Sequence, residues 1–211
     1  CAICTQISPS VTNKINSVGL PQSGVKIKIN PENNEIMMSG AFVMKGYYKD
    51  KERTDETIKD GWLCTGDQGK IDEDGYLYIT GRVKDTFKTS KGEFIEPLGL
   101  EKFFGDTVEF EQICIVGLGN PQPMLLVVLS ESGKSTEKNV LKSMIENKLI
   151  NVNKDLVSYK RISTIIFVKD DWNPENEILT PTMKIKRNKI NDKYCEKFKG
   201  WSDNIETIIW E

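Results

Sequence analysis

The chain contains no histidine, and this absence removes several classes of enzyme. Its 211 residues include only five cysteines. Ser-His and Cys-His hydrolases need histidine as general base, so no such site lies within this chain. Cys1 and Cys4 form a CxxC, but no second pair and no histidine completes a zinc site. We therefore expect no metal site, free thiols and a reducing intracellular compartment.

Long hydrophobic runs and an excess of one charge are also absent. No apolar stretch approaches the roughly 18 residues that cross a bilayer, so we expect no transmembrane segment. The 29 Lys and Arg nearly balance the 31 Asp and Glu, giving a net charge of −2. This balance shows no electrostatic signature of nucleic-acid binding. The start at Cys1 has no Met, basic segment or signal-like core, which is typical of a cut inside a larger protein.

The remaining pattern favours an α+β fold in two parts. We expect a β-rich subdomain over 1–83 and, over 84–211, a small domain of about three strands with flanking helices. The boundary is placed at Val83–Asp85, because Lys84-Asp85 has no apolar anchor. The strands expected before it are 25–29, 35–39, 62–65, 68–71 and 76–80, with a helix over 51–58. Those expected after it are 112–117, 124–130 and 161–169, with helices over 97–104 and 138–150.

One hairpin carries two fixed charges of opposite sign. Gly66-Asp67 is read as a tight link between two short strands, and Asp72–Gly75 as the hairpin turn. The return strand stops at Gly81, just before Arg82. An antiparallel hairpin brings Asp67 and Arg82 to one edge, although fifteen positions separate them. A carboxylate suits a ribose diol and a guanidinium suits phosphate oxygens, but from the pattern alone a surface salt bridge is the favoured reading.

A basic stretch lies near the C-terminus, before a final helix. Residues 181–200 hold seven Lys or Arg against two acids. Such a stretch is usually a solvated face. The order of residues in Thr180–Arg187, TPTMKIKR, is more specific than this charge.

Three segments together resemble the adenylate-forming superfamily of acyl-CoA synthetases, luciferases and peptide-synthetase adenylation domains. They are Thr65-Gly66-Asp67, then Gly81–Asp85 followed by Lys91-Gly92, and finally Thr180–Arg187. Met183 stands where this superfamily usually has glycine, and with its LTPT lead it is similar to long-chain fatty acid–CoA ligases. The phosphate-gripping loop and magnesium motif of the family would lie upstream, so the resemblance implies a distal part that is inactive alone.

The resemblance implies an acyl-adenylate made from a fatty acid and ATP, then thioester transfer to coenzyme A, with Mg²⁺ required. It implies rotation of the C-terminal lid about Lys84. The implied roles are Lys184 as catalytic residue, Asp67, Arg82 and Ile79 at the nucleotide, and Ser90, Lys91 and Gly92 on the coenzyme A side. Core packing explains Ile79 equally well.

Long-chain substrates imply work at a membrane surface, and hence a location in the cytoplasm or on the cytoplasmic face of a membrane. Two alternatives stay open. One is an adenylating enzyme with another acceptor, and the other is a non-catalytic nucleotide-binding or interaction module.

Overall fold

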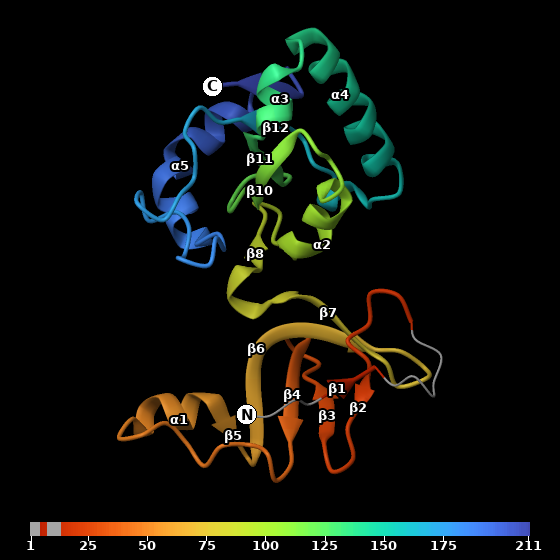
Figure 1. Cartoon of the computed structure of the whole chain (residues 1–211), viewed down its shortest axis with the longest axis vertical. Helices are drawn as coiled ribbons and strands as arrows, with labels where there is room; N and C mark the ends of the chain where they lie inside the picture. Colours follow the sequence, from red (N-terminus) through yellow and green to blue (C-terminus); the bar gives the residue numbers. More distant parts are fainter. Residues whose placement is uncertain (1–4, 8–13) are drawn as a thin grey trace. The chain divides into compact units, whose positions relative to one another are not determined.

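The computed structural model describes residues 5–7 and 14–211. The chain divides into two compact units, unit 1 (Cys1–Lys84) and unit 2 (Asp85–Glu211), coloured in sequence order in Figure 1. Both units combine helices with β-sheet, which confirms the α+β class. The CxxC formed by Cys1 and Cys4 lies outside the described residues, and among the described cysteines Cys64, Cys114 and Cys195 are free thiols.

Unit 1 is built on an antiparallel sheet. Its strand order is β3-β4-β6-β5, and β7 also pairs with β6. The strands are β3 (Lys26–Ile29), β4 (Glu35–Ser39), β5 (Ile58–Lys59), β6 (Trp62–Ile71) and β7 (Leu77–Arg82). The pair β1 (Thr5–Gln6) and β2 (Leu20–Pro21) and the helix α1 (Lys51–Thr57) complete the unit.

Strand β6 corrects the expectation of two short strands joined by a tight link. It runs without a break through Gly66 and Asp67, and its ribbon is strongly curved (Figure 1). Gly66 has a φ of 76°, and the register with β7 shifts between Gln68 and Gly69. A glycine at positive φ and a bulge bend a strand while keeping it in the ladder, so no link is needed. Strand β7 likewise continues past Gly81, because Arg82 still pairs with β6.

Unit 2 contains a four-stranded mixed sheet in the order β10-β11-β12-β13. Its strands are β10 (Phe110–Val116), β11 (Met124–Leu129), β12 (Ile165–Phe167) and β13 (Ile208–Trp210). The first pair is antiparallel and the other two are parallel. The sequence predicted the first three, with the third too long, and missed β13. Three residues at the chain end give too little alternation to indicate a strand.

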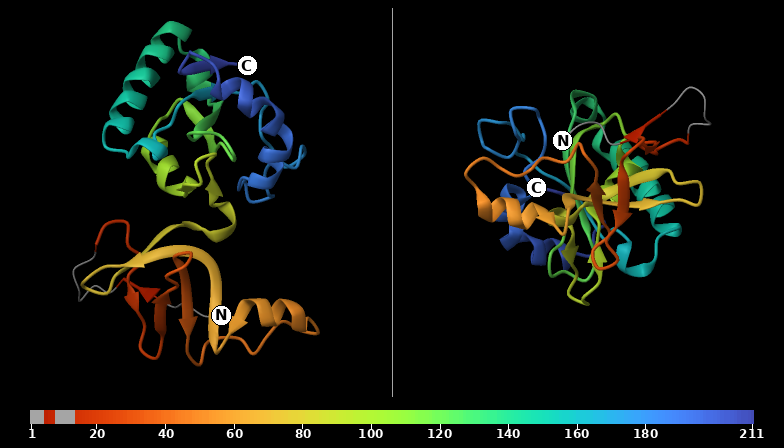
Figure 2. Two further views of the ribbon diagram at one scale, coloured as in Figure 1. Left: turned by 180° about the vertical axis from the view of Figure 1, so that it is seen from behind. Right: turned by 90° about the horizontal axis from the view of Figure 1, so that it is seen from below.

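Helices cover both faces of this sheet. They are α2 (Pro97–Glu101), α3 (Glu131–Ser135), α4 (Lys138–Lys154) and α5 (Arg187–Ser202). Figure 2 shows α4 and α5 on opposite faces. Leu126 of β11 belongs to the apolar cluster under α5, whereas Leu125 belongs to the cluster with α2 and α4. A strand buried on both faces is apolar throughout, as β11 is.

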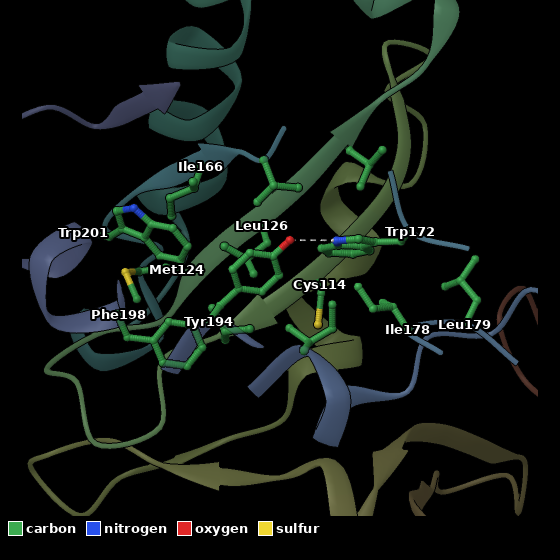
Figure 3. Packing of buried hydrophobic residues seen from close by; sticks show 14 residues of the cluster. Cys114, Met124, Leu126, Ile166, Trp172, Ile178, Leu179, Tyr194, Phe198 and Trp201 are labelled. Atoms are coloured by element: carbon green, nitrogen blue, oxygen red, sulfur yellow. Dashed lines mark hydrogen bonds between the residues drawn. The ribbon is translucent and has the colours of Figure 1, made fainter. Parts of the chain in front are cut away.

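The cluster under α5 has a polar contact at its centre. The Tyr194 side chain is fully buried, and the indole Nε1 of Trp172 donates to its hydroxyl at 3.3 Å (Figure 3). Buried tyrosine and tryptophan need such a partner for their polar atoms. The contact ties the loop after β12 to α5.

None of the helices among residues 5–7 and 14–211 is both long and apolar enough to cross a membrane.

Candidate functional site

Asp67 and Arg82 face each other across the β6–β7 ladder. They are register partners, and Arg82 Nε donates to Asp67 Oδ1 at 2.9 Å. Thr65 holds this part of β6, since its hydroxyl donates to the carbonyl of Ile36 on β4 and accepts from the amide of Asp67. No described residue donates to Asp67 Oδ2. The pair therefore leaves a carboxylate oxygen available on a well-anchored strand.

Ile79 lies on β7, three positions before Arg82. It is half-buried and pairs in register with Gly69. The register shift leaves Thr80 as an extra residue on β7 between Ile79 and Arg82, and such a bulge interrupts the alternation of side chains along the strand. The structure pairs Asp67 directly with Arg82, whereas Ile79 pairs with Gly69.

A tight turn presents Ser90, Lys91 and Gly92 to solvent in unit 2. It joins β8 (Phe87–Lys88) to β9 (Phe94–Ile95). Thr89 closes the turn with three hydrogen bonds. Its amide donates to the Glu93 carbonyl, its carbonyl accepts from the Gly92 amide, and its hydroxyl accepts from the Glu93 amide. Gly92 has a φ of 82°. A glycine at positive φ is what this turn requires.

The turn before Lys184 has the same hydrogen-bond pattern. The Thr180 amide donates to the Lys184 carbonyl at 2.8 Å, its carbonyl accepts from Met183 at 2.9 Å, and its hydroxyl accepts from the Lys184 amide at 3.0 Å. Met183 takes the place of glycine and has a φ of 61°. The turn is therefore fixed although its glycine position holds a side chain.

Lys184 is exposed at the end of this turn. Within residues 5–7 and 14–211, no hydrogen bond or ion pair engages its ammonium. Three other cations of the basic stretch are paired with acids from outside it. These pairs are Lys189 with Glu177, Lys193 with Asp170, and Lys197 with Glu211. Arg187 is also paired with acids, whereas no ion pair with a described residue engages Lys184, Lys186 or Lys199.

Arg187, at the first position of α5, has a role that the sequence did not reveal. Its Nη2 donates to both carboxylate oxygens of Glu101 at 2.6 Å, and its Nη1 donates to the Ile115 carbonyl at 3.1 Å. Its Nη1 also lies 3.2 Å from the Cys114 sulfur, and its Nε lies 3.3 Å from Asp85 Oδ2. The motif TPTxKxxR includes this arginine, but nothing in its spacing indicates these partners.

Electrostatics in this cluster follow from burial. Burial raises the pKa of the Cys114 thiol to about 12, more than the nearby guanidinium lowers it. Burial alone would lower the pKa of Arg187, but the acidic groups of Cys114, Glu101 and Asp85 raise it. The guanidinium is therefore charged and the thiol neutral at ordinary pH.

The neighbouring residues Lys84 and Asp85 differ in burial and in ion pairing. They lie in the short 3-10 helix η1 (Val83–Asp85). Lys84 is exposed, and none of the residues that the structure describes pairs with its ammonium. The carboxylate of Asp85 is partly buried against Arg187.

In the described part of the chain, no cluster of three His, Cys, Asp or Glu could hold a metal ion.

A family model for the AMP-binding enzyme C-terminal domain matches residues 84–203, more than half of the chain. The chain therefore belongs to the family of AMP-binding enzymes that carry this domain, which confirms the resemblance to adenylate-forming enzymes.

Several curated relatives are named as enzymes that act on fatty acids. Fatty acyl-CoA synthetase B of Dictyostelium discoideum is 29% identical over 209 residues, covering 90% of this chain and 31% of the relative. The chloroplastic long-chain fatty acid–[acyl-carrier-protein] ligase of Arabidopsis thaliana is 30% identical, covering 92% of this chain and 31% of the relative. This chain spans about a third of the length of these relatives.

A solved structure agrees in fold. The A-PCP didomain of carboxylic acid reductase from Segniliparus rugosus, solved in complex with AMP, matches with a TM-score of 0.70 and 25% identity. The match covers 87% of this chain and 28% of that chain. A long-chain fatty acid–CoA ligase of Mycobacterium tuberculosis is a further relative, 29% identical over 89% of this chain and 34% of its own length.

Proposed function

We propose that this chain is the distal part of an ATP-dependent long-chain fatty acid–CoA ligase. The full-length protein would join a fatty acid to AMP, release pyrophosphate, and transfer the acyl group to coenzyme A. The observation that carries the proposal is the exposed Lys184 ammonium. It lies at the end of a hydrogen-bonded turn with no described residue paired to it, in a chain of the AMP-binding family.

In this proposal Lys184 serves the first half-reaction. Attack of the fatty-acid carboxylate on the α-phosphate gathers negative charge from both reactants. A positioned ammonium that is not already neutralised stabilises that charge in the transition state. Lys184 meets both conditions, because its turn is fixed and its charge is unpaired among the described residues.

Asp67 and Arg82 bind the nucleotide in the same scheme. The free oxygen Oδ2 of Asp67 accepts hydrogen bonds from the ribose hydroxyls, and Arg82 holds the ribose or a phosphate. Their mutual bond orients both side chains before the nucleotide arrives. Ile79, half-buried on the strand that carries Arg82, packs near the nucleotide in this scheme.

The second half-reaction needs different groups over the same adenylate. We propose that unit 2 rotates about Lys84, which withdraws Lys184 and brings in the Ser90–Gly92 turn. Lys84 suits a hinge because its exposed side chain has no partner among the described residues. Gly92 lets the backbone approach the thioester-forming site closely, since it carries no Cβ.

Magnesium would be supplied with ATP, and its ligands would come from outside this chain. We accordingly propose that the 211 residues alone are inactive. An ATP–pyrophosphate exchange rate above background for the isolated chain would contradict this. For the full-length protein, long-chain substrates favour association with a membrane surface.

The direct test separates the two half-reactions in the full-length protein. Lys184→Ala should abolish most ATP–pyrophosphate exchange with a fatty acid, yet leave transfer from a supplied acyl-adenylate to coenzyme A largely intact. Lys199→Ala, which removes another exposed lysine in the basic stretch, is the matched control and should change neither rate. Equal loss of both half-reactions in Lys184→Ala would contradict the assigned role. No turnover of any acid by the unaltered protein would favour the non-catalytic alternative.

A second candidate function differs in the molecule that accepts the acyl group, and one relative supports it. The Arabidopsis thaliana relative is named as a ligase for acyl-carrier protein. A panel of fatty acids, assayed with coenzyme A and with acyl-carrier protein, decides between the two. Thioester formed on coenzyme A and strongest with long chains supports our proposal, whereas product on the carrier protein alone supports the alternative.

A further inference from the structure

One guanidinium in unit 2 links the residue after the proposed hinge to the turn that carries Lys184. Arg187 follows Lys184 by three positions, and Asp85 directly follows Lys84. We propose that Arg187 is a positioning residue. It fixes the Lys184 turn to the body of unit 2 and holds Asp85 to that same body, so that the chain bends at Lys84 and not beyond it. This inference rests on the proposed function, because the roles of Lys184 and Lys84 come from there.

The Lys184 turn has few other polar attachments to the rest of unit 2. Leu179 at its base is fully buried and forms an isolated bridge with Ile185, and the Lys186 amide donates to the Ile178 carbonyl at 2.8 Å. These contacts hold the turn to its own hairpin stem, and the stem is packed through Ile178 and Leu179 into the apolar cluster under α5. Arg187 adds the bonds that reach α2 and β10.

The anchor is rigid because both terminal nitrogens of the guanidinium are hydrogen-bonded and its Nε lies at ion-pair distance from Asp85. Nη2 is chelated by Glu101, whose Oε1 also accepts from the Ile115 amide at 2.8 Å. Nη1 donates to the Ile115 carbonyl. A planar guanidinium with fixed donors loses these bonds together if it moves. The start of α5 is therefore held in both position and direction, and a displacement of about 1 Å at a catalytic group can cost about a hundredfold in rate.

Asp85 gives the same cluster a link toward the unit boundary. Its Oδ2 lies 3.3 Å from Arg187 Nε, with 34% of its side chain exposed. Glu101 already compensates the guanidinium charge, so the Asp85 pair is not needed for neutrality. It restrains the first residue of unit 2 instead. A change of backbone angles then falls on Lys84, whose side chain has no partner in the described ranges.

The variants are chosen to keep the buried charge while removing the geometry. Arg187→Lys retains a cation beside Glu101 but has no fork to reach Asp85 and Ile115 at once. Asp85→Asn keeps the shape of the side chain and removes only the carboxylate charge that faces Arg187 Nε. Lys189 lies on α5, as Arg187 does, and forms an exposed ion pair with Glu177. Lys189→Gln breaks that pair and is the matched control.

Hydrogen exchange on the 211-residue chain tests the anchor without any reaction. In Asp85→Asn, we expect amide exchange over 84–88 to speed up about tenfold, while exchange over 187–202 stays as in the unaltered chain. Lys189→Gln should leave 84–88 unchanged. If Asp85→Asn leaves exchange over 84–88 unaltered, Asp85 is not held by Arg187 in solution and the proposal fails.

Kinetics of the full-length ligase test the positioning role. Arg187→Lys should slow adenylate formation at saturating ATP by about tenfold or more, with the KM for ATP within about twofold. Transfer from a supplied adenylate should persist, because Lys184 is withdrawn in that step. Equal loss of both half-reactions, in parallel with loss of folded protein, would make Arg187 merely structural and overturn the proposal. If the unaltered protein forms no adenylate, the proposed function fails, and exchange over 84–88 alone then decides whether the anchor exists.

Discussion

Gly92 and Met183 occupy the same position in two turns of matching geometry. In each turn a threonine three residues earlier closes the loop through its amide, carbonyl and hydroxyl. The φ angles are 82° for Gly92 and 61° for Met183. Glycine takes this conformation at no steric cost, whereas a side chain brings Cβ close to a backbone oxygen. The turn that carries Lys184 thus includes a strained residue that the Ser90–Gly92 turn lacks.

Met183→Gly should leave the chain slightly more stable. The left-handed conformation costs about 1–2 kcal/mol for a residue with Cβ, and the extra freedom of glycine in the unfolded chain returns about 0.5–1 kcal/mol of that. We expect the free energy of unfolding to rise by up to about 1 kcal/mol in urea titrations. Met183→Ala is the control, because it removes the exposed side chain but keeps the strain. Equal stability of the two variants would show that Met183 is not strained.

Gly92→Ala should have the opposite effect. A Cβ on Gly92 meets no atom within 4 Å, so the loss comes from backbone strain alone. We expect the free energy of unfolding to fall by about 1 kcal/mol. Gly99 also has open space around its Cβ position, but it lies inside α2 with no positive φ. Gly99→Ala should therefore stabilise the chain, and a loss at both positions would point to crowding instead of strain.

Asp67→Asn should weaken nucleotide binding without harming the fold. The Arg82 side chain is 65% exposed and that of Asp67 33%, and ion pairs near the surface contribute about 0–1 kcal/mol to stability. A carboxylate that accepts from ribose hydroxyls contributes more to binding, so AMP affinity of the full-length protein should fall about tenfold or more by calorimetry. Lys51→Gln, which breaks another exposed pair with Asp55, is the control. Unchanged AMP affinity in Asp67→Asn would leave the pair as a surface salt bridge.

Local pattern predicted those parts of the site that depend on neighbours in the chain. The Asp67–Arg82 pairing follows from one turn, Asp72–Gly75, with a strand on either side. The curvature of β6 could not be foreseen, because a bulge after Gln68 depends on how Gly69 packs against Ile36.

The Arg187 cluster could not be foreseen for a different reason. Its partner Glu101 lies 86 positions away, and Cys114 lies 73 positions away. No periodicity within α5 encodes contacts that only the assembled sheet creates. The same holds for the basic stretch, whose lysines pair with acids from other segments, such as Asp170 and Glu211.

Cys114→Ala should change how stability depends on pH. Burial raises the pKa of this thiol from 9.0 to about 12, so the folded chain keeps the proton when the unfolded chain releases it. The stabilisation from the neutral thiol is present below pH 9 and is lost as the pH rises from about 9 toward about 12. In the unaltered chain this group should remove about 1 kcal/mol between about pH 9 and pH 10. Cys114→Ala has no thiol at this position and does not lose this free energy of unfolding. In urea titrations, the difference in stability between the unaltered chain and Cys114→Ala should therefore be smaller at about pH 10 than at about pH 8. Cys195→Ala, which removes an exposed thiol, should keep the pH dependence of the unaltered chain. An identical pH dependence for Cys114→Ala would show that the Cys114 thiol is not protected by burial beside Arg187.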